Sequence, residues 1–194
     1  DVYKRQFEYS VLEQIQKRVL WLSMQIVHYA NSLRETGSSA KVGGHQASCA
    51  SMVSLMTALY FHSLRFGDKV SVKPHGSPVY HAIQYLLGNL PEEKLRQFRS
   101  FNGLQSYPSR TKDVDEVDFS TGSVGLGAVV HNFARLTRQF VRDHFGYPRS
   151  NRFIALMGDA ELDEGNVWEA LGEETLQELG QVLWIVDLNR QSLD

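Results

Sequence analysis

The chain has 194 residues, of which 42% are apolar, and this is enough to bury the core of one domain. Its 20 basic and 22 acidic side chains leave a net charge of −2 with neither sign clustered, which argues against a nucleic-acid surface and a basic membrane patch. No apolar stretch reaches transmembrane length and no signal peptide is visible, while a lone Cys49 excludes an intramolecular disulfide and fits a reducing cytoplasm.

The first third of the chain is predicted to be helical. Residues 1–6 (Asp-Val-Tyr-Lys-Arg-Gln) resemble a translated adapter remnant, and we exclude them from the fold prediction. Over residues 7–35, apolar side chains recur at steps of three and four, which predicts a long amphipathic helix. A glycine-containing loop at 42–45 then leads to a second predicted helix at 47–66, which is rich in small and apolar residues.

The middle of the chain alternates short elements with loops. We expect a short strand at 70–72, a helix at 79–87 and a short helix at 91–98, which opens with proline at the favoured first position. Residues 101–118 are irregular and polar. Because so long a connection is unusual in a compact domain, this segment is a candidate functional loop.

A glycine-rich segment, Thr-Gly-Ser-Val-Gly-Leu-Gly at 121–127, precedes a predicted helix at 128–144. Its backbone N–H groups and the positive end of the helix suit an anionic or polar ligand, although glycines also serve tight turns and close packing. A dinucleotide-binding motif is disfavoured, because residues 118–120 are not a buried strand and the glycine spacing is wrong.

The most informative feature is a strand–helix–strand crossover at the end of the chain. Continuous apolar runs at 152–157 and 182–187 predict two buried parallel strands, with a helix at 168–179 between them. The carboxyl ends of such strands lie side by side. Asp159 follows the first strand and Asn189 the second, so that a carboxylate and an amide oxygen can share a Mg2+ ion carrying a diphosphate. The alternative is an ordinary crossover with turn residues at its strand ends.

Gly-Asp-Ala at 158–160, followed by Asn-Arg-Gln-Ser-Leu-Asp at 189–194, resembles the metal–diphosphate motif of thiamine diphosphate enzymes. Over residues 7–194 the order of motifs resembles the N-terminal, diphosphate-binding domain of the transketolase superfamily, and within it the homodimeric pyruvate dehydrogenase E1 component. The earlier motifs are Gly-Gly-His at 43–45, His-Gly-Ser-Pro-Val-Tyr at 75–80, Gly-Leu-Gln-Ser-Tyr-Pro at 103–108 and the segment at 121–127. This resemblance implies a three-layer α/β/α fold with a mostly parallel central sheet, preceded by the long N-terminal helix. It also implies thiamine diphosphate and Mg2+ as cofactors.

The resemblance assigns roles by position. His45 and His75 would lie near the thiazolium and the substrate as proton donors or cofactor contacts, which suits the pKa of histidine; without the family, each is an ordinary loop residue. Further cofactor contacts would come from Ser77, Gly122, Val124, Gly158, Asp159, Ala160, Glu161 and Asn189. The metal ligands would be Asp159, Asn189 and the main-chain carbonyl of Gln191.

Three positions bear on how far the family pattern extends. Ala160 stands where the family usually has glycine, and its methyl group is tolerated only if the backbone does not need a positive φ. Ser109 follows Tyr-Pro where the pyruvate-type pattern has histidine, so one expected imidazole is missing and the substrate is left open. Glu164 matches a glutamate that meets its counterpart across the dimer interface, or is simply an acid in the first turn of a helix.

We therefore predict a fragment of a thiamine diphosphate- and Mg2+-dependent enzyme, the decarboxylating E1 component of a 2-oxo acid dehydrogenase. Transketolase, a non-catalytic paralogue and a generic nucleotide-phosphate binder are the alternatives. The intact protein is expected to be a cytoplasmic homodimer that acts on a 2-oxo acid or a sugar phosphate and, as an E1, meets a lipoyl-bearing E2 acyltransferase. No nucleic-acid or membrane partner is expected. The fragment alone should not turn over, because the family's activating glutamate belongs to a second domain.

Overall fold

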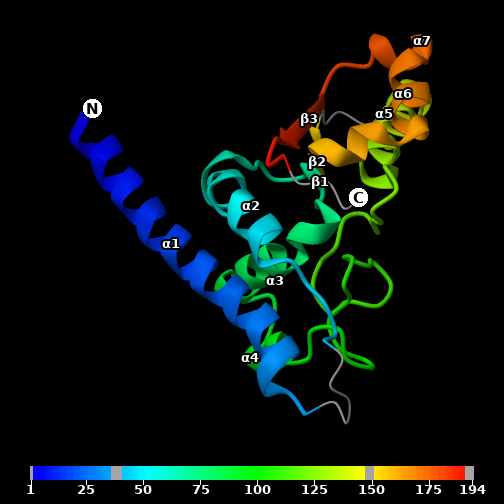
Figure 1. Ribbon diagram of the computed structural model, residues 1–194. Helices are drawn as coiled ribbons and strands as arrows, with labels where there is room; N and C mark the ends of the chain where they lie inside the picture. Colours follow the sequence, from blue (N-terminus) through cyan, green and yellow to red (C-terminus); the bar gives the residue numbers. More distant parts are fainter. Residues whose placement is uncertain (1, 36–40, 147–150, 191–194) are drawn as a thin grey trace. The chain divides into compact units, whose positions relative to one another are not determined.

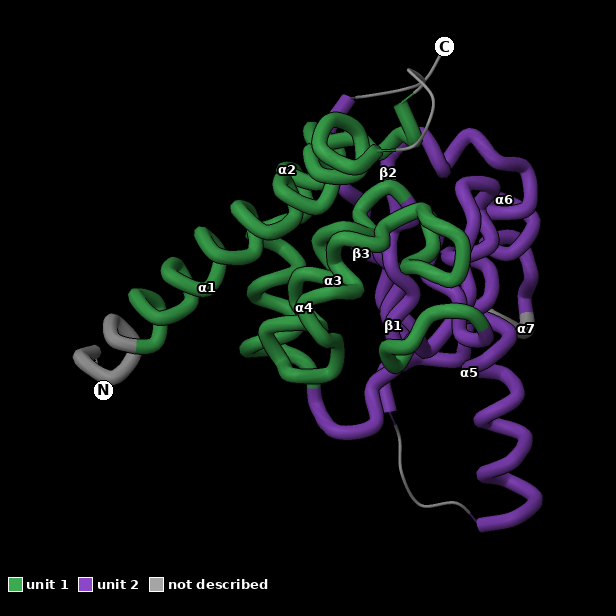
Figure 2. Tube along the Cα trace, turned by 90° about the horizontal axis from the view of Figure 1, so that it is seen from below, with its two compact units in different colours: residues 1–64, 75–106, 112–116 green, residues 65–74, 107–111, 117–194 purple. Residues whose placement is uncertain are grey.

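The computed structural model describes residues 2–35, 41–146 and 151–190. The chain forms two compact units (Figure 2). Unit 1 comprises residues 1–64, 75–106 and 112–116, and unit 2 comprises residues 65–74, 107–111 and 117–194. Each unit has its own cluster of buried apolar side chains. None of the helices among the described residues is long and apolar enough to cross a membrane.

Unit 1 is built from helices, beginning with the long helix α1 (Figure 1). The predicted helices are present, but the second one stops its regular α-helical turns earlier than expected and ends in a π-helical turn, and the one predicted at 91–98 covers only Glu92–Leu95. A similar π-helical turn ends α1. The elements are α1 (Val2–His28), η1 (Tyr29–Leu33), α2 (Gln46–Ala58), η2 (Leu59–Ser63), η3 (Pro74–Gly76, of which Pro74 belongs to unit 2), α3 (Ser77–Leu86) and α4 (Glu92–Leu95).

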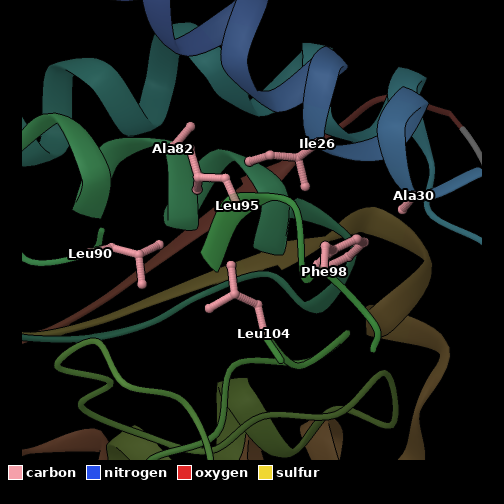
Figure 3. Close-up of a cluster of buried hydrophobic side chains, with 7 residues drawn as sticks. All are labelled: Ile26, Ala30, Ala82, Leu90, Leu95, Phe98 and Leu104. Atoms are coloured by element: carbon pink, nitrogen blue, oxygen red, sulfur yellow. The ribbon is translucent and has the colours of Figure 1, made fainter. Parts of the chain in front are cut away.

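The core of unit 1 joins segments that are far apart in the chain (Figure 3). Helices α1 and α3 and the residues around α4 each contribute, and Phe98 is the largest side chain in the cluster. Removing such side chains from water is the main favourable term in folding. The cluster consists of Ile26, Ala30, Ala82, Leu90, Leu95, Phe98 and Leu104.

Unit 2 holds a three-stranded parallel sheet in the order β1-β2-β3. The strands are β1 (Lys69–Ser71), β2 (Phe153–Gly158) and β3 (Val182–Asp187). Every residue of β2 is buried, as its continuous apolar run predicts. The α/β class, the parallel sheet and the long N-terminal helix are confirmed.

The predicted bounds of the crossover helix are wrong. In place of one helix at 168–179, the chain forms η4 (Asp159–Asp163), α6 (Gly165–Gly172) and α7 (Glu174–Gln177). The break falls at Glu173, whose backbone is extended, directly after Gly172. Val167 and Ala170 are the buried positions of α6, and Val167 packs in the core of unit 2 with residues of β2 and of α5 (Leu126–Phe145). The helix is therefore placed by its packing against α5 and the sheet.

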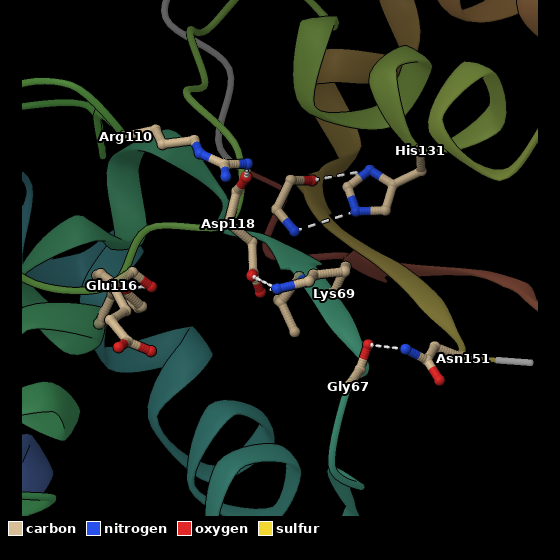
Figure 4. Close-up of polar contacts among 10 residues, drawn as sticks. Gly67, Lys69, Arg110, Glu116, Asp118, His131 and Asn151 are labelled. Carbon is tan, nitrogen blue, oxygen red and sulfur yellow. Dashed lines mark hydrogen bonds and ion pairs between the residues drawn. The ribbon is translucent and has the colours of Figure 1, made fainter. Parts of the chain in front are cut away.

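A buried histidine joins α5 to β1 (Figure 4). The main-chain N–H of Ser71 donates to Nε2 of His131 over 3.1 Å, and Nδ1 of His131 lies 2.7 Å from the carbonyl oxygen of Gly127. Both contacts are satisfied when the proton is on Nδ1 of a neutral ring. Burial lowers the pKa of His131 to about 4. The link between helix and strand thus depends on an uncharged imidazole.

This dependence predicts a loss of stability at mildly acidic pH. The folded-state pKa of His131 lies below its ordinary value of 6.5, so between those values the unfolded chain binds a proton that the folded chain does not. The stabilisation should be complete above pH 6.5 and lost as the pH falls towards 4, with a total of roughly 3 kcal/mol. Urea unfolding from pH 7 to pH 4 measures it. In His131→Gln, this part of the fall in unfolding free energy between pH 7 and pH 4 should be absent. A pH dependence that is unchanged in this variant would contradict the assignment.

Candidate functional site

The carboxyl edge of the sheet in unit 2 carries the two predicted metal-binding side chains. Gly158, the last residue of β2, lies opposite Asp187, the last residue of β3, in parallel register. Asp159 and Asn189 follow these strand ends. The main-chain N–H of Arg190 donates to Oδ2 of Asp159 over 3.1 Å, so the segments after the two strands are in contact. Their role as metal ligands stays a prediction.

The carboxylate of Asp159 fits a cation. Its Oδ2 accepts the hydrogen bond from Arg190, whereas its Oδ1 is buried and has no hydrogen-bond partner among the described residues. A buried carboxylate oxygen without a partner is costly, and a hard cation would satisfy it. No group of three or more His, Cys, Asp and Glu side chains that could hold a metal occurs in the described ranges. Asp159 would therefore act with amide and carbonyl oxygens, of which the predicted carbonyl of Gln191 lies outside the described residues.

A buried lysine, which the sequence did not suggest, lies at the same edge. Nζ of Lys73 is 2.7 Å from Oδ2 of Asp187, and the two side chains are 5% and 10% exposed. Oδ2 of Asp187 also accepts from Nδ2 of Asn189 over 3.3 Å. A Cβ at Gly158 would lie 3.2 Å from Cε of Lys73, so the lysine side chain passes close to the end of β2. Lys73 follows the short strand that the sequence predicts at 70–72, and this position was the signal available in the sequence.

Glu161 closes the turn after β2. Its Oε2 accepts the main-chain N–H of Gly158 over 2.9 Å. Burial raises the pKa of Glu161, and the hydrogen bond from Gly158 and the charge of Lys73 oppose this rise only in part. The edge thus combines one buried ammonium group with several carboxylates, which suits a ligand made of a divalent cation and an anionic diphosphate.

Ala160 lies in η4 and is not among the non-glycine residues with positive φ in the described part of the chain. The condition under which its methyl group is tolerated is therefore met. The residue that does adopt a left-handed backbone at this edge is Arg190, with φ of 55°. Such conformations cost free energy in a non-glycine residue and often mark functional sites.

The glycine-rich loop before α5 is held against α6. Nδ2 of Asn166 donates to the carbonyl oxygen of Val124 over 2.9 Å. Gly125 has φ of 75°, and a Cβ there would lie 2.4 Å from Oδ1 of Asn166, so only glycine fits. Gly122 is partly exposed and Val124 is 49% exposed. The predicted aminopyrimidine contacts of Gly122 and Val124 stay predictions.

Unit 1 brings the two predicted histidines together. The ring centroids of His45, just before α2, and His75, in η3, are 5.1 Å apart. Sγ of Cys49 lies 3.5 Å from the carbonyl oxygen of His75. The hydroxyl of Ser77 is buried and donates to the carbonyl oxygen of Ser106 over 2.8 Å, so its proton is used within the unit. The cofactor-binding role of Ser77 stays a prediction.

Comparison with known proteins identifies the family. Residues 39–194 match the family model described as the transketolase, thiamine diphosphate binding domain. The chain belongs to this family. The resemblance to the transketolase superfamily is therefore confirmed.

Individual relatives include enzymes of two kinds. The chain is 31% identical over 175 residues to a transketolase of Pongo abelii, covering 83% of this chain and 27% of that protein. It is 29% identical over 195 residues to a pyruvate dehydrogenase E1 component of Cupriavidus necator, covering 95% of this chain and 21% of the relative. A solved transketolase of Campylobacter jejuni matches with a TM-score of 0.75 at 22% identity, over 91% of this chain and 28% of that one, which supports the fold. The chain thus spans about a quarter of the length of these relatives.

Replacing Lys73 should reveal a buried ion pair. Lys73→Met keeps the length of the side chain but leaves Asp187 without its cation, and removing one partner of a buried pair costs about 3–5 kcal/mol. The matched control is Lys69→Met on β1, which removes the more exposed pair with Asp118, worth less than about 1 kcal/mol. Urea unfolding at pH 7 compares them. Equal losses in the two variants would show that the Lys73 pair is not effectively buried.

Proposed function

We propose that this chain is the diphosphate- and Mg2+-binding domain of a thiamine diphosphate-dependent enzyme, the decarboxylating E1 component of a 2-oxo acid dehydrogenase. The observation that carries the proposal is the carboxylate of Asp159, with one buried oxygen that has no partner among the described residues, at the parallel strand edge that also leads to Asn189. The thiamine diphosphate family of the chain supports the identity of the cofactor. When bound, that cofactor supplies the electron sink for cleavage of a bond next to a carbonyl.

In this proposal, the residues of the chain bind and orient the cofactor and transfer protons. Asp159 and Asn189 would hold the metal ion through hard oxygen atoms. The ammonium group of Lys73 would offset the negative charge brought by a diphosphate. Glu161 holds the main chain at Gly158 in place through its hydrogen bond. His45 and His75, which lie close together in unit 1, would hold or release a proton near the substrate.

The E1 reaction is favoured by the motifs at 75–80, 103–108 and 189–194. Transketolase is the second candidate, because Ser109 replaces the histidine of the pyruvate-type pattern and the transketolase of Pongo abelii reaches 31% identity. A non-catalytic paralogue would also explain Ser109, but the ordinary backbone at Ala160 removes one argument for it. Turnover of the full-length protein separates these functions. An E1 consumes a 2-oxo acid with an artificial electron acceptor, a transketolase consumes a ketose phosphate with an aldose phosphate, and a paralogue consumes neither.

The metal-binding assignment is tested at Asp159. Asp159→Asn keeps the shape of the side chain but removes its charge, and should weaken Mg2+-dependent binding of thiamine diphosphate by at least about tenfold, because even outer-shell changes at metal sites cost that much. Isothermal titration with and without Mg2+ measures it. Asp163→Asn is the matched control, because Asp163 is an exposed carboxylate in the same short helix. Unchanged Mg2+-dependent binding of thiamine diphosphate in Asp159→Asn would contradict the proposed metal site. Robust turnover by these 194 residues alone would contradict the expected need for a second domain.

We also propose that the intact protein is a cytoplasmic homodimer and, as an E1, meets a lipoyl-bearing acyltransferase. Helix α5 supports self-association, because a row of exposed apolar side chains follows its length at helical spacing. The row consists of Leu126, Phe133, Leu136 and Phe140, which are 37–55% exposed. Phe133→Ser should therefore lower the dimer fraction in sedimentation velocity. Phe101→Ser removes a more exposed phenylalanine, 96% exposed, from unit 1 and should leave association unchanged. Equal effects would count against α5 as the interface.

A further inference from the structure

One face of α3 holds the polar loop that follows α4. Ser77, Tyr80 and His81 occupy positions i, i+3 and i+4 of this helix, which place them on one face. All three are buried, with 2% exposure or less. Polar side chains at such depth need partners, and here the partners come from the two ends of one segment, residues 105–106 and 112–116, which belong to the same unit as α3. We call these three side chains the loop anchor.

Each member of the loop anchor makes a separate contact. The hydroxyl of Ser77 donates to the carbonyl oxygen of Ser106 over 2.8 Å. The hydroxyl of Tyr80 donates to the carbonyl oxygen of Glu116, also over 2.8 Å. Nδ1 of His81 lies 2.9 Å from Oδ2 of Asp115. The contacts therefore hold both ends of the segment, and the fold of the loop does not depend on a single bond.

The pair of His81 and Asp115 is the strongest of these contacts. Both side chains are fully buried. Nε2 of His81 and Oδ1 of Asp115 have no hydrogen-bond partner among the described residues, so each group relies on the other for compensation. The rings of Tyr80 and Phe98 meet the imidazole edge-on at 5.5 and 6.3 Å and restrict its rotation. A buried carboxylate with one partner loses nearly all its compensation when that partner is removed.

The loop anchor also lies next to a candidate site residue. His75 is separated from Ser77 by Gly76 alone, and α3 starts at Ser77. A regular helix transmits the position of its anchored face to its first turn, because its backbone is rigid over these few residues. We propose that His81 and Asp115 are positioning residues, which clamp residues 112–116 to α3 within unit 1 and thereby fix the orientation of His75. The contacts that form the clamp are independent of the proposed function. Only the importance of the clamp for catalysis rests on that function.

Limited proteolysis with trypsin tests the clamp without any cofactor. Lys112 is exposed within the segment, and cleavage there reports its local opening. His81→Phe should raise the cleavage rate by at least about 30-fold, because Asp115 is left buried and unpaired. Tyr80→Phe removes one hydroxyl, keeps the fold and should raise the rate about fivefold, which corresponds to one ordinary hydrogen bond. Arg96→Gln, which breaks an exposed ion pair with Glu92 in the same unit, should leave the rate unchanged.

Two further measurements separate positioning from plain stabilisation. The double variant His81→Phe with Asp115→Leu replaces the pair by two apolar groups, and it should restore most of the protection. The ring resonances of His75 in proton–carbon NMR should shift in His81→Phe and Tyr80→Phe but not in Arg96→Gln. A protected loop in both single variants would overturn the clamp. An opened loop with unchanged His75 resonances would overturn the positioning role. Because neither measurement involves thiamine diphosphate or Mg2+, both outcomes are independent of the Asp159 test.

Discussion

The parallel pairing of β2 with β3 sets the geometry on which the candidate site depends. It aligns Gly158 with Asp187, so that the chain leaves both strands at the same edge and Asp159 and Asn189 follow together. A slip of one residue would turn every side chain of β2 to the opposite face and would remove the alignment of Gly158 with Asp187. The pairing of β1 with β2 then brings Lys73 to this edge, two residues beyond the end of β1.

The charged side chains of Lys73 and Asp187 at that edge are buried, so water screens their interaction only weakly. Lys73 and Asp187 are almost fully buried, and Asp159 has one buried oxygen without a partner among the described residues. Opposite charges in such a place compensate each other strongly, whereas the exposed Lys69–Asp118 pair contributes little. The buried ammonium group of Lys73 at this edge is compatible with the diphosphate of the cofactor named in the description of the family.

Unit 1 holds the two predicted site histidines and a set of buried contacts close to one of them in the chain. The rings of His45 and His75 lie close together at the starts of helical segments. The loop anchor on α3 ties residues 105–106 and 112–116 of the same unit to the helix that follows His75. Sites supported by rigid elements and by a second layer of contacts keep their geometry better than sites on free loops. Relatives include both transketolases and E1 components, so substrate assays are what distinguish the two reactions.

The sequence by itself determined the family, the α/β class and the two strands of the crossover. Buried parallel strands appear as continuous apolar runs, and the family is identified by motifs that occur in a fixed order along the chain. Tertiary structure alone decided where α6 lies, because Val167 packs with residues of α5 and β2, whereas the break at Glu173 directly follows Gly172, a poor helix former that the sequence shows. It also decided the partners of buried charges. Lys73 meets Asp187 across 114 residues and His81 meets Asp115 across 34, and no local pattern encodes such contacts, because they form only when separate elements pack together.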